Sequence, residues 1–384
     1  MVGVKPRLHE ALGLDTCVRC TLCADSCPTY VNSGDPLVAP AFRLRMLKDL
    51  MKGSGVGEDA CREAFRCTVC GRCMVACPFS IRTVDLWYLL RHYARLTGKW
   101  PAELSGLESS LLTYRNPYGA DASLRTYWAE VAGLDPSRLV KEEARIVLFM
   151  GCTSAYRSVG QDVLAAAALI LDRAGEDWTT LGEEEWCCGC PLLLLGNWEA
   201  AKEFAEHNVK AIEAKGAELV ATTCATCYKM LKLEYPAILG RQPRFKVVHI
   251  VELLAKYFTE LKFQARKLEL RVAYHDPCDL ARVGGVVEAP RQLISEVAEL
   301  VEFRDSRERS TCCGGGGLLQ VVDPALRLRI AERRVQEAVA AGVNVLASAC
   351  PACKASFVEV AREMDVELEV LDVVELVARA MGLA

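Results

Sequence analysis

From residue 144 to the C-terminus, short apolar runs alternate with longer stretches in which apolar residues recur at helical spacing. This alternation is typical of βαβ units, in which parallel strands are joined by helices. In the first half of the region it predicts four strands and three helices. The strands span 146–150, 178–181, 219–222 and 246–250, and the helices span 157–174, 198–215 and 251–259.

The second half of this region repeats the first. The stretch 145–152 matches 270–278, 186–189 matches 311–314, and 219–227 matches 345–353, at a nearly constant offset. A fixed offset across three separate segments indicates an internal duplication. The sequence therefore predicts two homologous α/β domains with parallel sheets, covering 144–262 and 263–384.

Residues 1–100 have a different pattern. Apolar positions at helical spacing occur in 41–50, 58–66 and 84–96, and no strand-like alternation accompanies them. We therefore expect an all-α module. Residues 101–143 combine prolines with polar residues and are predicted to form a linker or docking segment.

Length and charge narrow the class of protein. A chain of 384 residues suggests two or three domains. Its net charge of −4 and the lack of a basic run argue against nucleic-acid binding. The longest apolar stretch, 163–171, is about half of what a bilayer-spanning helix needs, and residues 1–15 do not resemble a signal peptide. We therefore expect a soluble, cytoplasmic chain.

Twenty cysteines provide the chemistry. Without an export signal, their tight local spacing favours metal ligation over disulfides, and so many thiolates imply a reducing compartment. Two runs near the N-terminus read C-x2-C-x2-C-x3-C-P, and in this pattern the fourth cysteine binds the other cluster. We therefore predict two cubane [4Fe-4S] clusters, a pair of zinc sites being disfavoured by the spacing. One cluster takes Cys17, Cys20, Cys23 and Cys77, and the other takes Cys67, Cys70, Cys73 and Cys27.

Each repeat carries five further cysteines where a predicted strand ends or the next helix begins. Parallel strands bring these positions to one edge of the sheet, where ligands bind. Five thiolates exceed what a closed cubane needs, so we expect an irregular cluster or one with an open iron. Alternatively, one cysteine of each set is a packed free thiol, or one set holds zinc. The sets are Cys152, Cys187, Cys188, Cys224 and Cys227, and Cys278, Cys312, Cys313, Cys350 and Cys353.

These residues resemble the cysteine-rich CCG-domain family. The two C-x2-C-x2-C-x3-C-P runs, at residues 17–28 and 67–78, are ferredoxin motifs. With these motifs in front of the repeats, the architecture is similar to that of a family of iron–sulfur subunits of heterodisulfide reductase. The resemblance implies a noncubane [4Fe-4S] cluster on each set of five cysteines. It also implies that a disulfide binds between the two clusters and is cleaved there, and that its two halves leave as thiols. The iron–sulfur subunits of glycolate and lactate oxidases share the layout, so the alternative is a non-catalytic electron carrier for a flavin-dependent hydroxy-acid dehydrogenase.

Either function requires partners. The chain lacks a nucleotide-binding glycine fingerprint, so a flavin belongs on another chain. We expect a flavoprotein, a membrane cytochrome or a quinone-linked subunit, which could hold the protein at the inner face of the membrane. A small disulfide or dithiol is the expected substrate.

Several residues leave more than one interpretation open. His275 and His249 are candidate proton donors, or they simply hydrogen-bond a loop. Asp279 stands where many relatives have histidine, and Asp372 corresponds to His249 in the other repeat. Gly314 to Gly317 allow close approach to a cluster or form a flexible turn. Cys61 and Cys190 are expected to be spare thiols. Arg19, Arg66 and Arg72 are expected to be solvated charges or contacts to a partner protein.

Overall fold

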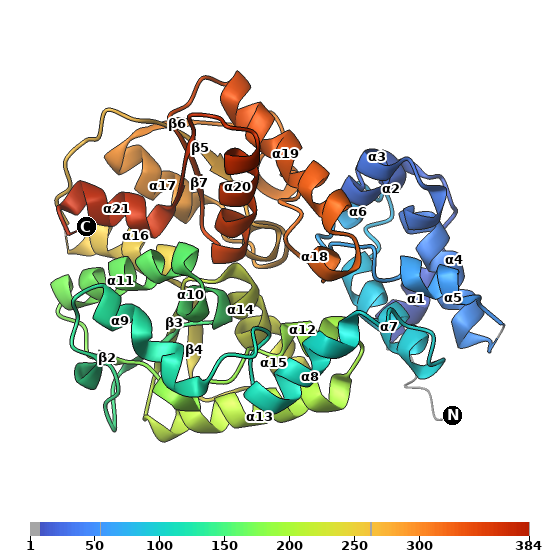
Figure 1. The fold of residues 1–384 in the computed structure, drawn as a ribbon, viewed down its shortest axis with the longest axis horizontal. Helices are drawn as coiled ribbons and strands as arrows, with labels where there is room; N and C mark the ends of the chain where they lie inside the picture. The colour runs from blue at the N-terminus through green and yellow to red at the C-terminus, as the bar shows by residue number, and fades with distance from the viewer. Residues whose placement is uncertain (1–7, 54, 262, 384) are drawn as a thin grey trace.

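The computed structural model describes residues 8–53, 55–261 and 263–383 and has three parts. Figure 1 shows the N-terminal helical module on one side and the two α/β repeats stacked on the other. The predicted fold class, a helical module followed by two repeats with parallel sheets, is confirmed.

The N-terminal module contains only helices in its described part. Pro28, Pro36 and Pro40 each begin a helix, where proline costs no hydrogen bond. The predicted helices 41–50 and 84–96 are present within one residue at each end, and the third stops early, at Glu63. The elements are α1 (Leu8–Thr16), α2 (Leu22–Asp25), α3 (Pro28–Ser33), η1 (Pro36–Val38), α4 (Pro40–Met51), α5 (Glu58–Glu63), α6 (Arg72–Val75) and α7 (Thr83–Leu96).

The segment predicted to be a linker or docking segment is partly helical. It contains an eleven-residue helix, α8 (Leu104–Tyr114), followed by η2 (Ala122–Thr126), α9 (Tyr127–Val131) and η3 (Pro136–Arg138). It packs on the first repeat, because α9 contacts α11 and the carbonyl of Leu139 accepts a hydrogen bond from the Thr180 amide at 2.7 Å.

The first repeat is a four-stranded parallel sheet in the order β2-β1-β3-β4. The second strand, predicted to reach residue 181, ends at Thr179 because the next amide bonds Leu139 outside the sheet. The strands are β1 (Ile146–Phe149), β2 (Trp178–Thr179), β3 (Leu219–Thr222) and β4 (Lys246–His249). The helices are α10 (Cys152–Tyr156), α11 (Ser158–Arg173), η4 (Gly182–Glu184), α12 (Cys190–Leu194), α13 (Trp198–Ala214), α14 (Ala225–Lys229), η5 (Met230–Glu234), α15 (Tyr235–Leu239) and α16 (Ile250–Glu260).

The second repeat has the same topology, in the order β6-β5-β7-β8. Its strands are β5 (Arg271–His275), β6 (Glu299–Val301), β7 (Val345–Ser348) and β8 (Glu369–Asp372). Its helices are η6 (Cys278–Val283), α17 (Glu288–Val297), η7 (Arg307–Arg309), α18 (Leu319–Val322), α19 (Pro324–Ala340), α20 (Pro351–Glu363) and α21 (Val373–Met381). The repeats share one apolar core, in which α11 packs on α20 and α21, and α16 packs on α17.

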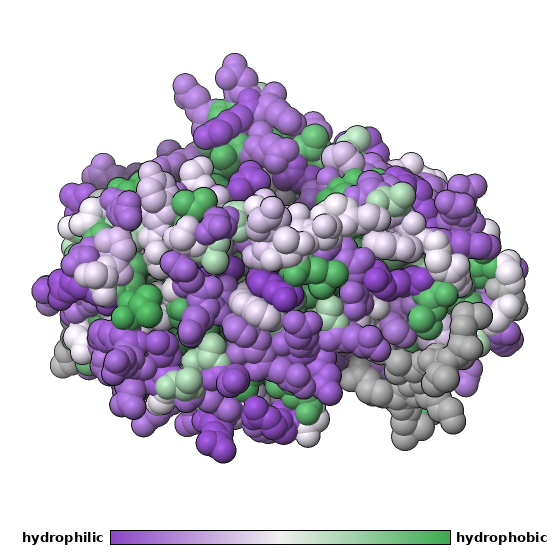
Figure 2. Space-filling view, turned by 60° about the horizontal axis from the view of Figure 1, so that its bottom comes forward, coloured by the Kyte–Doolittle hydropathy of each residue, from purple (hydrophilic) through white to green (hydrophobic). Residues whose placement is uncertain are grey.

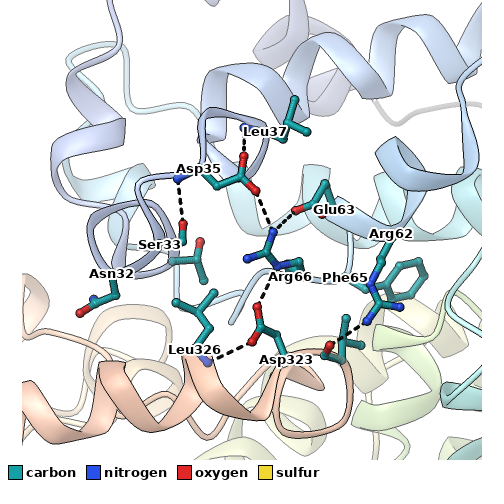
Figure 3. Close-up of polar contacts among 12 residues, drawn as sticks. Asn32, Ser33, Asp35, Leu37, Arg62, Glu63, Phe65, Arg66, Asp323 and Leu326 are labelled. Carbon is teal, nitrogen blue, oxygen red and sulfur yellow. Dashed lines mark hydrogen bonds and ion pairs between the residues drawn. The ribbon is translucent and has the colours of Figure 1, made fainter.

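Polar contacts join the helical module to the second repeat. Arg66 lies at the centre of Figure 3, with its guanidinium 2.9 Å from Asp323 and Glu63 and 2.8 Å from Asp35. Arg72 similarly pairs with Asp305 of the second repeat. The expectation that these two arginines are solvated or bind a partner protein is therefore wrong, because both are used in internal ion pairs. Arg19, in contrast, is exposed.

The outer surface is mixed in character. The face in Figure 2 is mainly hydrophilic, with apolar residues scattered over it. Within 8–53, 55–261 and 263–383, no helix has both the length and the hydropathy needed to cross a bilayer.

Candidate metal centres

The cysteines of each repeat lie just beyond the carboxyl ends of three strands. In the first repeat, Cys152 follows β1, the Cys187–Cys188 pair follows β2, and Cys224 and Cys227 follow β3. Because all strands of the sheet are parallel, these three loops lie at the same edge. The second repeat reproduces the arrangement after β5, β6 and β7.

The five thiols of the first repeat are buried and form a continuous series of contacts. Cys187 interacts with Cys152 and Cys188, and Cys188 interacts with Cys227, which interacts with Cys224. These hydrogen bonds raise the pKa of Cys187 and lower that of Cys188 far from the ordinary value for a thiol. Thiolates packed this closely repel one another unless a cation lies between them, so the donor set fits a thiophilic metal such as iron.

The second repeat gathers its thiols in the same way. Cys313 and Cys353 are 3.2 Å apart, Cys353 also interacts with Cys350, and Cys312 interacts with Cys313. Cys278, which opens the π-helical turn η6, lies near Cys312 and Cys313, and all five sulfurs belong to buried or half-buried residues.

The two sets of five face each other. Cys224 of the first repeat interacts with Cys350 of the second, so the series of sulfur contacts crosses between the repeats. All ten cysteines line one cavity of about 260 Å³. A single small molecule in this cavity could therefore contact both sets.

Cysteines of the two ferredoxin motifs lie beside one another. Cys73 and Cys77 of the second motif line a small cavity together with Cys17, Cys20 and Cys23 of the first. Conversely, Cys27 lies close enough to Cys67 and Cys73 to raise the pKa of both, after burial as the larger cause. The two motifs are thus close enough to share ligands, and the assignment of each cysteine to one cubane stays a prediction.

One sulfur contact links the helical module to the repeats. Cys70 forms a hydrogen bond with Cys312, and this bond together with burial raises the pKa of the Cys70 thiol well above its ordinary value. Gly316 and Gly317 make the contact possible, because a Cβ on Gly317 would lie 2.0 Å from the carbonyl oxygen of Cys67. The glycine run predicted to allow close approach therefore lies against the ferredoxin module.

Three buried arginines stand beside the thiols, and no local sequence pattern marks them. Arg43 donates to Cys27 Sγ at 4.0 Å, and Arg125 donates to Cys152 Sγ at 3.8 Å and to Glu185 at 2.8 Å. Arg91 donates to main-chain carbonyls of all three parts of the chain, including Cys67, Leu194 and Gly317. Burial lowers the pKa of Arg91 to about 10, so it remains charged at neutral pH.

The candidate proton donors are both buried, and burial lowers the pKa of His249 to about 4 and that of His275 to about 3. Both rings are therefore neutral at pH 7. His249 caps α16, where its ring nitrogen accepts the Val251 amide, and Asp372 caps α21 in the same way. A nitrogen of His275 and the sulfurs of Cys313 and Cys353 all lie within 4.8 Å of one another. Proton donation by either histidine stays a prediction.

The two spare cysteines have different surroundings. Cys61 is buried in α5 beside Thr97. Cys190 lines the cavity between the repeats and lies near Cys188, where burial raises its pKa. That both cysteines are spare thiols stays a prediction.

Lys229, Asp279 and Tyr88 form a polar cluster where the three parts of the chain meet. Lys229 Nζ is 2.9 Å from an Asp279 carboxylate oxygen and 2.9 Å from the hydroxyl of Tyr88 on α7. Burial alone would lower the pKa of Lys229, but the combined attraction to the surrounding acidic groups, Asp279 first among them, outweighs it and the pKa is raised. Asp279, which stands where many relatives have histidine, is thus the partner of a lysine.

Comparisons with known families agree with this division of the chain. A family model described as "Cysteine-rich domain" matches residues 146–232 and again 272–358. A model described as "4Fe-4S dicluster domain" matches residues 13–81.

Similar proteins extend over nearly the whole chain. A subunit of the dihydromethanophenazine:CoB–CoM heterodisulfide reductase of Methanosarcina acetivorans is 37% identical, the match covering 98% of this chain and 96% of that protein. The corresponding subunit from Methanosarcina mazei is 35% identical, over 97% and 95%. EtfAB:quinone oxidoreductase of Syntrophomonas wolfei is 26% identical, over 97% of this chain and 59% of that protein.

Among solved structures, a hypothetical protein from Helicobacter pylori has a similar fold. Its TM-score is 0.58 with 11% identity, and the match covers 98% of this chain and 73% of that one. At this identity the likeness concerns the fold alone.

Proposed function

The chain belongs to a family of heterodisulfide reductase subunits that are iron–sulfur oxidoreductases, and from this premise we propose that its two repeats reduce a disulfide or oxidise the corresponding dithiol. In the direction of reduction, the S–S bond breaks, two electrons enter, and two protons complete two thiols. The proposal includes two noncubane clusters, one on each set of five cysteines, in addition to the two cubanes.

The observation that carries this proposal is the contact between Cys224 and Cys350, which puts both cysteine sets around one cavity. When bound, iron–sulfur clusters supply one-electron transfer and iron that can bind sulfur. All three parts of the chain line the cavity, through residues that include Tyr118, Thr68 and Val69 of the ferredoxin module, and Gly315 to Gly317.

The sulfur contacts also support a direction of electron entry. We call Cys27, Cys67, Cys70 and Cys73 the inner cubane set, and Cys17, Cys20, Cys23 and Cys77 the outer cubane set. Cys70 of the inner set contacts Cys312 of the second repeat. The cysteines of the second repeat in turn contact those of the first through Cys350 and Cys224. We propose that electrons pass from the outer cubane set to the inner one, then to the second repeat and finally to the first.

We also propose that the chain is one component of a complex in the cytoplasm. A flavoprotein, a membrane cytochrome or a quinone-linked subunit would exchange electrons with the outer cubane. The names of the similar proteins support a redox complex of this kind, since they include a subunit of a heterodisulfide reductase and an EtfAB:quinone oxidoreductase.

A second candidate function is electron transfer alone, for a flavin-dependent dehydrogenase. The unbroken series of sulfur contacts from Cys70 to Cys152 favours it, because a relay needs the same closeness as a reaction centre.

Electron paramagnetic resonance with added thiol separates the two candidates. The oxidised, iron-replete protein is titrated with 2-mercaptoethanol, and a reaction centre should develop a thiol-dependent paramagnetic signal. The Cys188→Ser variant should lose the signal together with viologen-linked disulfide reduction. Cys61→Ala, which changes a buried cysteine that does not line the cavity, should keep both. A wild-type protein with full iron and no thiol-dependent signal is a relay.

A further inference from the structure

His275 is a buried polar side chain that lies beside the second set of cysteines. It ends strand β5, is 1% exposed, and its Nδ1 has no hydrogen-bond partner within the described part of the chain. One of its ring nitrogens and the sulfurs of Cys313 and Cys353 all lie within 4.8 Å of one another. The two sulfurs are 3.2 Å apart, so the imidazole lies against a pair of thiols.

The surroundings of His275 hold its ring in this position. Its main-chain carbonyl accepts the Ser348 hydroxyl at 3.1 Å, which ties it to strand β7. The ring packs edge-to-face on Phe357 of α20, with 4.8 Å between the ring centroids. The next residue, Asp276, forms a buried ion pair with Arg291. Contacts on more than one side therefore fix the orientation of the imidazole.

The first repeat has a different residue at the equivalent place. His275 pairs with Ser348 in the second sheet as Phe149 pairs with Thr222 in the first, and both partners lie two residues before a C-x2-C motif. Phe149 is fully buried, so an apolar ring fits this position of the fold. A buried imidazole nitrogen without a partner is costly, and phenylalanine avoids that cost. The difference indicates a polar contact of the second repeat, and the adjacent sulfurs are within its reach.

The chemistry of the imidazole and of cluster sulfurs is complementary. A neutral imidazole has one N–H donor, and burial keeps His275 neutral by lowering its pKa to about 3. Cluster thiolates accept hydrogen bonds, and such bonds stabilise the reduced, more negative state of a cluster. His275 can therefore raise the potential of a cluster while it keeps its proton.

We propose that His275 is a positioning residue of the second-repeat cluster, and that its N–H donates a hydrogen bond to the sulfur pair of Cys313 and Cys353, which raises the reduction potential of this cluster. The proposal rests on the proposed cluster of the second repeat, and it holds whether the chain reduces a disulfide or only relays electrons. Phe149 has no polar atom to offer at the equivalent place in the first repeat. The two centres are therefore chemically different although their cysteines match.

Hyperfine spectroscopy detects the contact directly. Full-length protein with nitrogen-15 in its histidines is reconstituted anaerobically, and pulsed EPR spectra are recorded across a redox titration. We expect a weak nitrogen-15 coupling on one paramagnetic cluster, which His275→Phe abolishes and His207→Gln retains. His207 is a matched control because its ring contacts the main-chain carbonyl of Glu184.

The reduction potential of the same cluster tests the effect of the bond. His275→Phe should lower it by about 59 mV, which is about a tenfold change in the equilibrium constant for one electron. Asparagine and glutamine place an amide N–H near the positions of Nδ1 and Nε2, so one of His275→Asn and His275→Gln should keep a potential close to that of the wild type. Rescue by an amide separates a hydrogen bond from a loss of packing, because all three variants lose the imidazole ring.

The outcomes distinguish this inference from the function proposed above. An iron-replete wild type without histidine coupling in any paramagnetic state, or with the strong coupling of nitrogen bound to iron, overturns the hydrogen bond. An unchanged potential in iron-replete His275→Phe also overturns it. If the coupling and the potential shift are found but no disulfide is reduced, disulfide reduction fails and this inference stands. About eight irons per chain would remove the second-repeat cluster and the inference with it.

Discussion

Gly317 provides the sharpest test of the junction between the ferredoxin module and the second repeat. Its φ is +68°, and a Cβ there would lie 2.0 Å from the carbonyl oxygen of Cys67 and 2.6 Å from two backbone atoms of Thr68. Main-chain atoms cannot rotate away as a side chain can, so alanine at this position must push the two parts of the chain apart. That movement weakens the bond from Arg91 to the Gly317 carbonyl, now 2.9 Å long, and the Cys70–Cys312 contact.

The expected magnitude follows from three contributions. Alanine at positive φ costs about 1 kcal/mol, relief of the overlap costs about 1–3 kcal/mol, and a weakened charged hydrogen bond adds about 1 kcal/mol. We therefore expect Gly317→Ala to destabilise the protein by about 3 kcal/mol or more. The rate of electron transfer from reduced viologen to a disulfide should fall by a larger fraction than the free energy of unfolding. The reason is that the junction both holds the two parts of the chain together and passes the electrons between them.

Gly285→Ala is a matched control. Gly285 also lies in the second repeat with φ of +73°, but no atom lies within 4 Å of its Cβ position. It should cost only about 1 kcal/mol. The assays are the apparent thermal midpoint under anaerobic conditions and the viologen-linked rate. If the two alanine variants match in both, the proposed tight contact at Gly317 is wrong.

Two further predictions concern buried side chains near the cysteines. Arg125→Gln together with Glu185→Gln removes the buried pair beside Cys152, where the guanidinium is 3.8 Å from Sγ, without leaving a lone charge. The guanidinium stabilises the reduced, more negative state of the first-repeat centre, and we expect its removal to cost about 1–2 kcal/mol of that stabilisation. The reduction potential of this centre should therefore fall by roughly 40–90 mV in an EPR redox titration. An unchanged potential would refute this role of Arg125. His249→Asn keeps the helix cap but removes a group whose pKa burial lowers from 6.5 to about 4. Because the folded state resists protonation of this histidine, the wild type should lose about 3 kcal/mol of stability as pH falls from about 6.5 towards 4, and the variant should lose less over that range, as measured by apparent unfolding midpoints at each pH.

Regular features of the fold follow from local sequence. The strand and helix positions of the first repeat were predicted within a few residues, because apolar spacing in a sheet or helix depends on near neighbours. The constant offset then extended the same topology to the second repeat. Placement of cysteines after the strands followed from the edge rule for parallel sheets.

What the sequence could not supply depends on contacts between distant segments. Arg125 lies in a stretch that reads as a linker, yet packing brings it to Cys152. Likewise, Arg66 reads as a surface charge until Asp323 of the second repeat meets it. Its partner lies more than 250 positions away, and no local pattern marks such a pair.

The most direct test of the whole account is the iron content of the anaerobically reconstituted full chain. If the ten cysteines of the repeats hold two four-iron clusters in addition to the ferredoxin pair, the protein should contain about sixteen irons per chain. A reproducible value of about eight, accounted for by the eight ferredoxin cysteines alone, would contradict it.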